Sequence, residues 1–380
     1  MHIVTTFLRR PLAIFGPGLF GMGLAVGGFG TYVTELIARG VDPGVAGFGA
    51  TLFLFGQFAV VWPTDVFARL SSVPLAAVVG FGLGAVGTAL GGVLSIPIAL
   101  GGRLLLGFGM GATFLAVMTY AGLCVKNRFI ARLQGLLGAT FTLGLAVGIA
   151  VTPWAVAQYG SALPAFVAAV PVAASMILLP KLSPVDSREY RHFTEYVHAF
   201  RTSGGIGLGL ANGASYGLLI VAITWYTNVL DRVTELPTTI VLTGFAAATF
   251  VGRTYSGRLG TVTTRKYAVE IGLVFLAVSL GLVAIALWFG SPFVLAFVLV
   301  LTGVGFGLPF GPLFSLAFDS LEVDAGVLLV GMTAIGNAVA LAYPWLVGQL
   351  FEATEGYVAG IATMSLSTAV VVVFWRLVTQ

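Results

Sequence analysis

Three charged residues lie within or near the ends of long apolar stretches, where ionisable side chains are rare. Arg103 and Arg253 each carry a guanidinium, whose planar set of donors suits a carboxylate or another anion. Glu35 is the one acid of its stretch and has the chemistry to carry a proton or to pair with Arg103. These residue types point to anion binding or charge transfer at a few isolated positions.

The sequence shows no arrangement for bond-making chemistry. None of Lys126, Lys181 and Lys266 follows a glycine, so the phosphate-binding loop of nucleotide hydrolases is absent. One cysteine, Cys124, and three dispersed histidines form neither a catalytic pair nor a metal-ligand set. We therefore expect no enzyme activity, no cofactor and no metal.

The composition requires much of the surface of this chain to face lipid. Of the 380 residues, 58% are hydrophobic and only 8% are charged, whereas a soluble protein carries about 25% charged residues. The low charge also excludes a disordered chain. The 52 glycines follow no Gly-X-Y repeat, and small residues let membrane helices pack closely. An integral membrane protein in contact with lipid is expected.

Apolar runs of about 20 residues, enough to span a bilayer, follow one another along the whole chain. They predict an all-α polytopic membrane protein with twelve transmembrane helices. The predicted spans are 12–37, 45–64, 73–96, 98–123, 134–157, 161–180, 204–229, 238–257, 267–289, 292–318, 325–350 and 356–377.

Basic residues gather in alternate loops. If the N-terminus is cytoplasmic, the outer loops keep Arg39 and Arg232, and the other loop residues lie inside: Arg9, Arg10, Arg69, Lys126, Arg128, Arg132, Lys181, Arg188, Arg191, Arg201, Arg258, Arg265, Lys266 and Arg376. This bias predicts a protein of the cytoplasmic (inner) membrane with both termini in the cytoplasm. It also explains the net charge of +4 without a nucleic-acid partner.

The longest hydrophilic stretch divides the chain into two parts. Within it, aromatic residues spaced among charges predict an amphipathic helix at the inner membrane surface. The expected organisation is an N-terminal six-helix bundle at 1–180, a cytoplasmic linker at 181–203 and a C-terminal six-helix bundle at 204–380. We expect the protein to be a monomer.

The two halves repeat each other at an offset of 196 positions. The offset aligns Gly107, Gly109 and Gly111 with Gly303, Gly305 and Gly307. It also aligns Asp65 and Arg69 with Thr261 and Arg265. A six-plus-six duplication follows, and in transporters built from repeats the substrate site lies near the midplane between them.

Three segments resemble motifs of the major facilitator superfamily. GGRLLLGFGMG (101–111) is similar to its fourth-helix signature of an arginine followed by spaced glycines, and PTDVFARLSS (63–72) and SGRLGTVTTRK (256–266) resemble two copies of its conserved loop. The resemblance implies two pseudo-symmetric bundles, alternating access and a small-molecule substrate. It also implies gating charges in the loops, here reduced to Asp65, Arg69, Arg258, Arg265 and Lys266.

A weaker resemblance concerns the surroundings of Arg253. Its spacing to Gly257 is similar to the arginine-proline-x-glycine-glycine pattern of the nitrate/nitrite porter branch, in which paired arginines bind the anion. The offset-equivalent position holds Gln57 instead of arginine, which argues against nitrate itself. A side chain extended to the inner headgroups is the other interpretation of Arg253.

Arg103 and Glu35 also have structural interpretations. Arg103 is equally suited to a fixed bond with the backbone of the first span or with Glu35. Glu35 is also suited to a solvated helix end near the outer surface, because its counterpart Asp231 borders Arg232.

Uncharged polar residues occur in spans that, by the resemblance, line a central cavity. Tyr32, Asn212, Tyr216 and Asn337 have groups that can orient a small organic solute. They are equally able to bond one helix to another.

Glycines and prolines are expected to break helices where the halves rock around a central site, although close packing would also explain the glycines. The expected breaks lie at Gly107, Gly109, Gly111, Pro153, Gly303, Gly305, Gly307, Pro309 and Pro312.

The sequence therefore predicts a secondary active transporter of a small solute. An anion is favoured because Arg103 and Arg253 are accompanied by almost no buried acid, and a proton is a candidate coupling ion. The alternative is a facilitative or proton-coupled exporter of neutral or hydrophobic compounds. A channel would need a polar filter, and a non-transporting receptor or scaffold would normally carry a soluble module, neither of which is found in the sequence.

Overall fold

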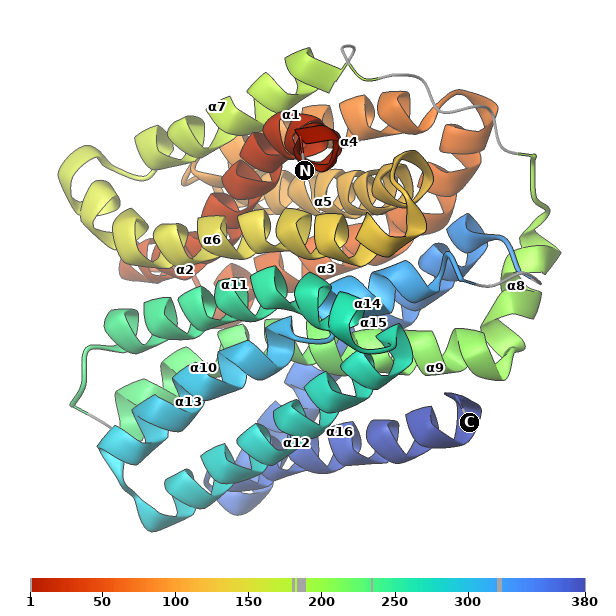
Figure 1. Cartoon of the computed structure of the whole chain (residues 1–380). Helices are drawn as coiled ribbons and strands as arrows, with labels where there is room; N and C mark the ends of the chain where they lie inside the picture. Colours follow the sequence, from red (N-terminus) through yellow and green to blue (C-terminus); the bar gives the residue numbers. More distant parts are fainter. Residues whose placement is uncertain (1, 180–181, 183–188, 234, 320–322, 380) are drawn as a thin grey trace. The chain divides into compact units, whose positions relative to one another are not determined.

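The computed structural model describes the chain except residues 1, 180–181, 183–188, 234, 320–322 and 380. The described residues form helices and connecting turns, with no strand among them (Figure 1). A helix satisfies its own backbone hydrogen bonds, which is required in lipid. The all-α prediction is confirmed.

A helix or a group of consecutive helices forms most of each of the twelve predicted spans. The first part of the chain contains α1 (His2–Gly27), α2 (Phe29–Ala38), α3 (Pro43–Leu70), α4 (Val73–Gly91), α5 (Ile96–Cys124), α6 (Asn127–Tyr159) and α7 (Ala162–Leu178). The rest contains α8 (Phe193–Arg201), α9 (Ser203–Asn212), η2 (Gly213–Gly217), α10 (Leu218–Val233), α11 (Thr238–Val262), α12 (Arg265–Phe289), α13 (Pro292–Gly307), α14 (Phe310–Leu316), α15 (Ala325–Thr354) and α16 (Val358–Thr379).

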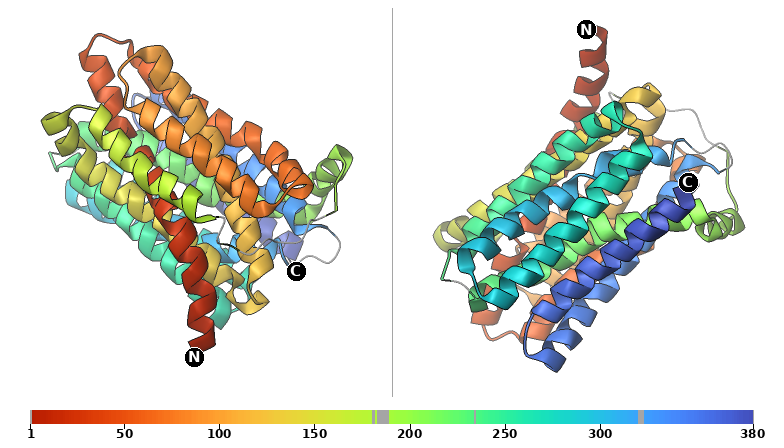
Figure 2. Two further views of the ribbon diagram at one scale, coloured as in Figure 1. Left: turned by 90° about the horizontal axis from the view of Figure 1, so that it is seen from above. Right: turned by 60° about the horizontal axis from the view of Figure 1, so that its bottom comes forward.

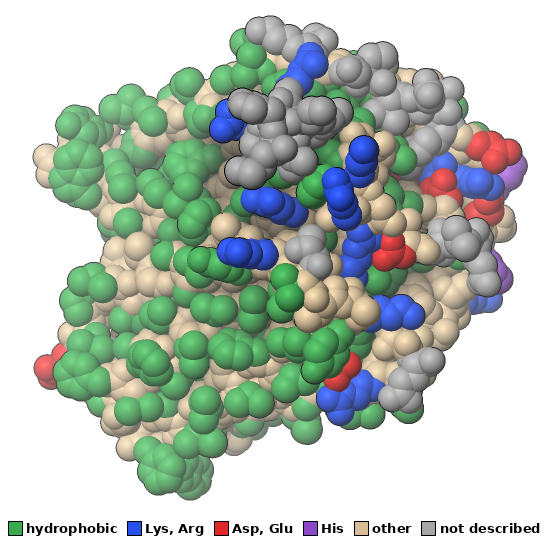
Figure 3. Space-filling view, in the orientation of Figure 1, with side chains coloured by type: hydrophobic (Ala, Val, Ile, Leu, Met, Phe, Trp, Pro, Cys, Tyr) green, Lys and Arg blue, Asp and Glu red, His purple; other side chains and the backbone are tan. Residues whose placement is uncertain are grey.

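Ten spans among the described residues are long and apolar enough to cross a bilayer. The apolar helix α7 is shorter, and α11, which carries Arg253 and Arg258, lies outside that set. Large side chains such as Trp288, Phe289 and Phe293 are 75–78% exposed, which suits lipid rather than water. On the face shown in Figure 3, hydrophobic side chains predominate.

Local sequence explains where many of the helices begin and end. The hydroxyls of Ser72 and Thr264 accept hydrogen bonds from the backbone N–H groups of the first turns of α4 and α12. Asp324 does the same at α15, with its carboxylate 2.9 Å from the N–H of Gly326. Gly290 ends α12 with a φ of +65°, a conformation that glycine adopts without strain.

The chain divides into two compact units. The N-terminal unit comprises residues 1–127 and 140–192, and the C-terminal unit comprises 128–139 and 193–380. The predicted linker at 181–203 falls partly outside the described residues, and its described part contains α8, in which Tyr196 is buried and Phe193 is exposed. Figure 2 gives two further views of the helices.

Glycine contacts repeat within the two units at the offset of 196 positions. In the N-terminal unit, a Cβ at Gly56 would lie 2.7 Å from the Leu104 carbonyl oxygen, and one at Gly111 would lie 2.8 Å from that of Gln57. In the C-terminal unit, a Cβ at Gly307 would lie 2.6 Å from the backbone nitrogen of Arg253, the offset-equivalent of Gln57. The spaced glycines therefore allow helices to touch through their backbones.

Several expected helix breaks are absent. Gly107, Gly109 and Gly111 lie within the continuous helix α5, and Pro153 lies within the continuous helix α6, so breaks at these positions were wrong predictions. In the first case the reason is close packing, because a Cβ at Gly107 would collide with the Phe53 carbonyl.

Other interruptions do occur. Helix α13 ends at Gly307 and α14 begins at Phe310, so the chain is interrupted around Pro309. Breaks at Gly303, Gly305 and Pro312 were wrong predictions, because these residues lie inside α13 and α14. Two interruptions were not predicted: α1 and α2 are separated at Gly28, and the π-helical turn η2 separates α9 from α10.

Candidate functional site

Arg103 is a buried cation of the N-terminal unit. It lies on α5 with only 5% of its surface exposed. Its guanidinium carbon lies 3.7 Å from the ring centroid of Phe29 on α2 and 4.9 Å from that of Phe53 on α3, which are cation–π distances. Its Nε is buried, and no described residue accepts a hydrogen bond from this guanidinium.

A small cavity adjoins Arg103. Its volume is ≈ 10 Å³, and its lining includes Tyr32, Thr88, Leu106 and Ala165. The Thr88 hydroxyl is buried and has no hydrogen-bond partner among the described residues. Besides Arg103, Tyr32 is the ionisable residue of this lining. Arg103, Tyr32 and Thr88 are thus the polar residues that line this cavity.

The described acids of the N-terminal unit all have partners other than Arg103. Glu35 lies 3.2 Å from Arg39 in an exposed pair at the end of α2. The structure therefore favours the helix-end interpretation of Glu35, and the fixed bond proposed between Glu35 and Arg103 is absent. The other acids are bound elsewhere: Asp42 to the Val45 N–H, Asp65 to Arg69, and Glu189 to Arg191.

Arg253 is a second buried cation, in the C-terminal unit. It is 0% exposed on α11, so its proposed extension to the headgroups was a wrong interpretation. Its Nη1 donates a hydrogen bond of 3.1 Å to the carbonyl oxygen of Gly138 on α6, and its guanidinium lies 4.2 Å from the ring centroid of Phe310. Tyr216 is buried in η2.

Uncharged polar residues of the C-terminal unit lie where α9 and α15 pack together. The Asn212 amide donates a hydrogen bond of 3.1 Å to the Met332 carbonyl, and a Cβ at Gly336 would collide with this amide. Asn337, the next residue, is 0% exposed, and neither atom of its amide has a partner among the described residues. Asn212 and Asn337 therefore lie near one helix seam.

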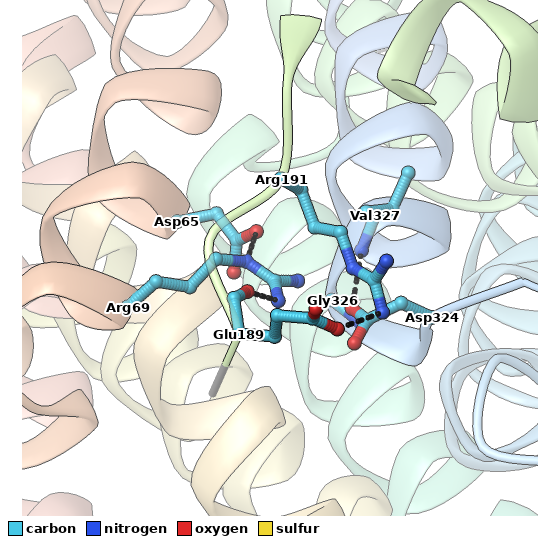
Figure 4. Close-up of polar contacts among 7 residues, drawn as sticks. All are labelled: Asp65, Arg69, Glu189, Arg191, Asp324, Gly326 and Val327. Carbon is cyan, nitrogen blue, oxygen red and sulfur yellow. Dashed lines mark hydrogen bonds and ion pairs between the residues drawn. The ribbon is translucent and has the colours of Figure 1, made fainter. Parts of the chain in front are cut away.

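In the first loop motif (63–72), Asp65 and Arg69 form a buried ion pair. Arg69 Nε lies 2.7 Å from Asp65 Oδ2, and the side chains are 0% and 1% exposed. Arg69 also donates a hydrogen bond of 2.8 Å to the Glu189 carbonyl, as Figure 4 shows. Since the two residues are four apart on α3, their side chains meet on one face of the helix.

The second loop motif uses different partners because Thr261 replaces the aspartate. Arg265 pairs at 2.5 Å with Asp319, whose side chain is 36% exposed. Lys266 Nζ lies 3.5 Å from the Thr379 carbonyl oxygen, and Arg258 is exposed.

The sequence did not single out several residues that complete these sites. Phe29, Phe53 and Thr88 come from three different helices around Arg103, and no local pattern marks them. Asp319 is far from Arg265 in the sequence. The pairs Glu35–Arg39 and Asp65–Arg69 do have a signal, namely opposite charges at i and i+4.

The fold and the sites define an integral, multi-pass membrane protein with buried cations. Among the described residues, no group of three or more His, Cys, Asp or Glu side chains could hold a metal ion. The single cysteine, Cys124, is free and half-buried at the end of α5.

The Major Facilitator Superfamily matches residues 15–343, and the chain belongs to this family. It is therefore a membrane transporter of small molecules rather than an enzyme. No curated protein sequence matches the chain.

Solved structures of transporters are similar to the chain over nearly its whole length. They include the fucose:proton symporter FucP of E. coli, with a TM-score of 0.76, 16% identity and coverage of 97% of this chain and 98% of that one. A structure of FucP in the outward conformation has a TM-score of 0.77 at 16% identity, covering 98% and 100% of the two chains. The human organic anion transporter MFSD10 (TETRAN) has a TM-score of 0.78 at 16% identity, covering 97% and 99%. At this identity the matches establish a shared fold.

Proposed function

We propose that this transporter moves a small anionic solute and that Arg103 contacts the anionic group. The observation that carries the proposal is a buried guanidinium with no acceptor among the described residues. Arginine stays protonated in proteins. A buried charge without a partner is unfavourable by several kcal/mol in general, and an intramembrane charge commonly marks a substrate or ion pathway.

The proposed mechanism, topology and gating residues are supported by the distribution of basic residues along the sequence and by the family of the chain. The transporter works by alternating access in the cytoplasmic membrane, as a monomer with both termini in the cytoplasm, and a proton is the candidate coupling ion. Asp65, Arg69, Arg258, Arg265 and Lys266 act in gating. The organic anion transporter among the similar structures is compatible with an anionic solute.

A neutral solute is the second candidate. It is favoured by the buried Asn337, whose amide has neither a donor nor an acceptor partner among the described residues. Asn212 and Tyr216 offer further uncharged polar groups in the same unit. One similar structure is a symporter of fucose, an uncharged sugar.

Matched pairs of anions and neutral analogues separate the two candidates. The thermal stability of the purified protein is measured with benzoate against benzamide, lactate against lactamide, and fucose. Because a ligand that binds the folded state raises its apparent stability, the anion of each pair should stabilise the wild type and its neutral partner should not. Stabilisation by fucose or by the amides alone would refute the anion proposal.

Transport of the best anion is then measured in liposomes by counterflow. We expect Arg103→Gln to reduce uptake roughly 100-fold, the size expected when a charged contact of a few kcal/mol is lost. Arg103→Lys should recover part of the uptake, since it keeps the charge without the planar fork. Arg128→Gln, which removes an exposed arginine, is the matched control. Unchanged uptake by Arg103→Gln would contradict the assigned contact.

A further inference from the structure

We propose that the cavity beside Arg103 holds one chloride-sized anion in the empty transporter, and that the anionic group of the solute must displace it. This inference rests on the proposed function and adds a second, inorganic ligand to the same site. The two ligands would then be mutually exclusive at Arg103.

The size of the cavity limits what it can hold. A volume of ≈ 10 Å³ is about that needed for one water molecule. One oxygen of a larger anion is of comparable size, and a chloride ion, which is slightly larger than a water molecule, would fit after a small movement of the lining side chains. A sulfate, a phosphate or a whole organic acid is too large for the cavity as the structure has it.

The chemistry of the lining favours an anion over a water molecule. Arg103 is a pure donor, and Thr88 is 3% exposed with a hydroxyl that lacks a partner among the described residues. Tyr32 also lines the cavity. A chloride ion would accept hydrogen bonds from these groups and also balance the charge, whereas water would leave the charge uncompensated.

The neighbours of the Arg103 guanidinium other than the cavity offer it no negative charge. Phe29 and Phe53 lie at cation–π distances, so they cover part of the guanidinium with apolar surface. The described acids of the unit are bound elsewhere, Glu35 to Arg39 and Asp65 to Arg69 among them. A diffusible anion is therefore the available counter-ion.

The inference predicts competition. A chloride ion in the cavity takes the donors that a carboxylate would need, so chloride should weaken the binding of the solute. A solute that arrives with its own negative charge restores the electrostatic balance when chloride leaves.

The first experiment measures thermal stability in chloride, bromide, gluconate and sulfate at one ionic strength. We expect chloride and bromide to raise the melting temperature of the wild type in a saturable manner, by roughly 2–4 °C, relative to gluconate and sulfate. Arg103→Gln should lose this response and Thr88→Val should shift it to higher chloride concentration. Arg128→Gln, with an exposed arginine removed, should keep it.

The second experiment adds benzoate, or the carboxylate that stabilises the wild type most, at several chloride concentrations. The apparent affinity for the carboxylate should fall as chloride rises and should be insensitive to gluconate. A wild type that responds equally to all four salts overturns the chloride site. If the carboxylate still binds through Arg103 in that case, the proposed function stands and only the present inference fails.

Discussion

The buried arginines Arg253 and Arg103, one in each unit, differ in whether the protein supplies a hydrogen-bond acceptor. In the C-terminal unit, Arg253 donates a hydrogen bond to the Gly138 carbonyl and stacks on Phe310. In the N-terminal unit, Arg69 is closed by Asp65, whereas Arg103 has aromatic neighbours and a cavity but no acceptor among the described residues. A buried cation with a built-in acceptor serves the fold, while one beside a cavity is available for a ligand.

Removing the negative charge of Asp65 from its buried ion pair with Arg69 should give the largest loss of stability. Asp65→Asn leaves Arg69 buried without its counter-charge, and we expect the free energy of unfolding to fall by about 3–5 kcal/mol. The control, Asp319→Asn, affects the partly exposed pair with Arg265 and should lower it by less than about 1 kcal/mol. Denaturant unfolding in mixed micelles measures both, and equal losses would remove the distinction between the two loop motifs.

Replacing the two buried arginines by methionine tests the comparison directly. Arg253→Met should lower the free energy of unfolding by about 1.5–3 kcal/mol, the size expected for a charge-assisted hydrogen bond. Arg103→Met should change it little, or raise it, when measured in gluconate, because the substitution removes an uncompensated buried charge. If Arg103→Met lowers the free energy of unfolding more than Arg253→Met does, Arg103 has a structural role.

Adding a methyl group to α5 tests whether the spaced glycines serve packing. A Cβ at Gly107 would collide with the Phe53 carbonyl, so Gly107→Ala should lower the free energy of unfolding by about 1–3 kcal/mol. Gly101, on the same helix, has no atom within 4 Å of the position that a Cβ would take. Gly101→Ala should therefore be neutral or slightly stabilising, and similar losses for both variants would count against the packing role.

The smallest expected effect concerns the amide of Asn337. Asn337→Leu keeps the number of side-chain heavy atoms and removes two buried polar atoms that lack partners among the described residues, so the free energy of unfolding should rise by about 1 kcal/mol. Asn212→Leu loses the hydrogen bond to Met332 and should have the opposite sign. A destabilised Asn337→Leu would indicate that the amide has a partner, such as a bound water.

The sequence predicted the spans well because hydrophobicity and length are local properties. Helices form most of each predicted segment, and the contact of Gly111 with Gln57 recurs at the offset of 196 positions as the contact of Gly307 with Arg253. The contact between Asp65 and Arg69 could also be predicted from the sequence, because residues at i and i+4 meet on one face of a single helix.

The sites were less predictable because their partners come from distant helices. Nothing in the residues around Arg253 reveals that Gly138 supplies its acceptor, so extension to the headgroups was the wrong interpretation. No local signal marks the interruptions at Gly28 and in η2, because their glycines resemble many others that lie in continuous helices.

The single cysteine offers a spectroscopic advantage. Cys124 ends the same helix that carries Arg103, at a separation of about 30 Å along the helix axis. One Cys124→Ser substitution yields a cysteine-free background into which pairs of labels can be introduced at chosen helix ends. Distances between such labels, with and without chloride, would record the opening and closing of the carrier in a lipid bilayer.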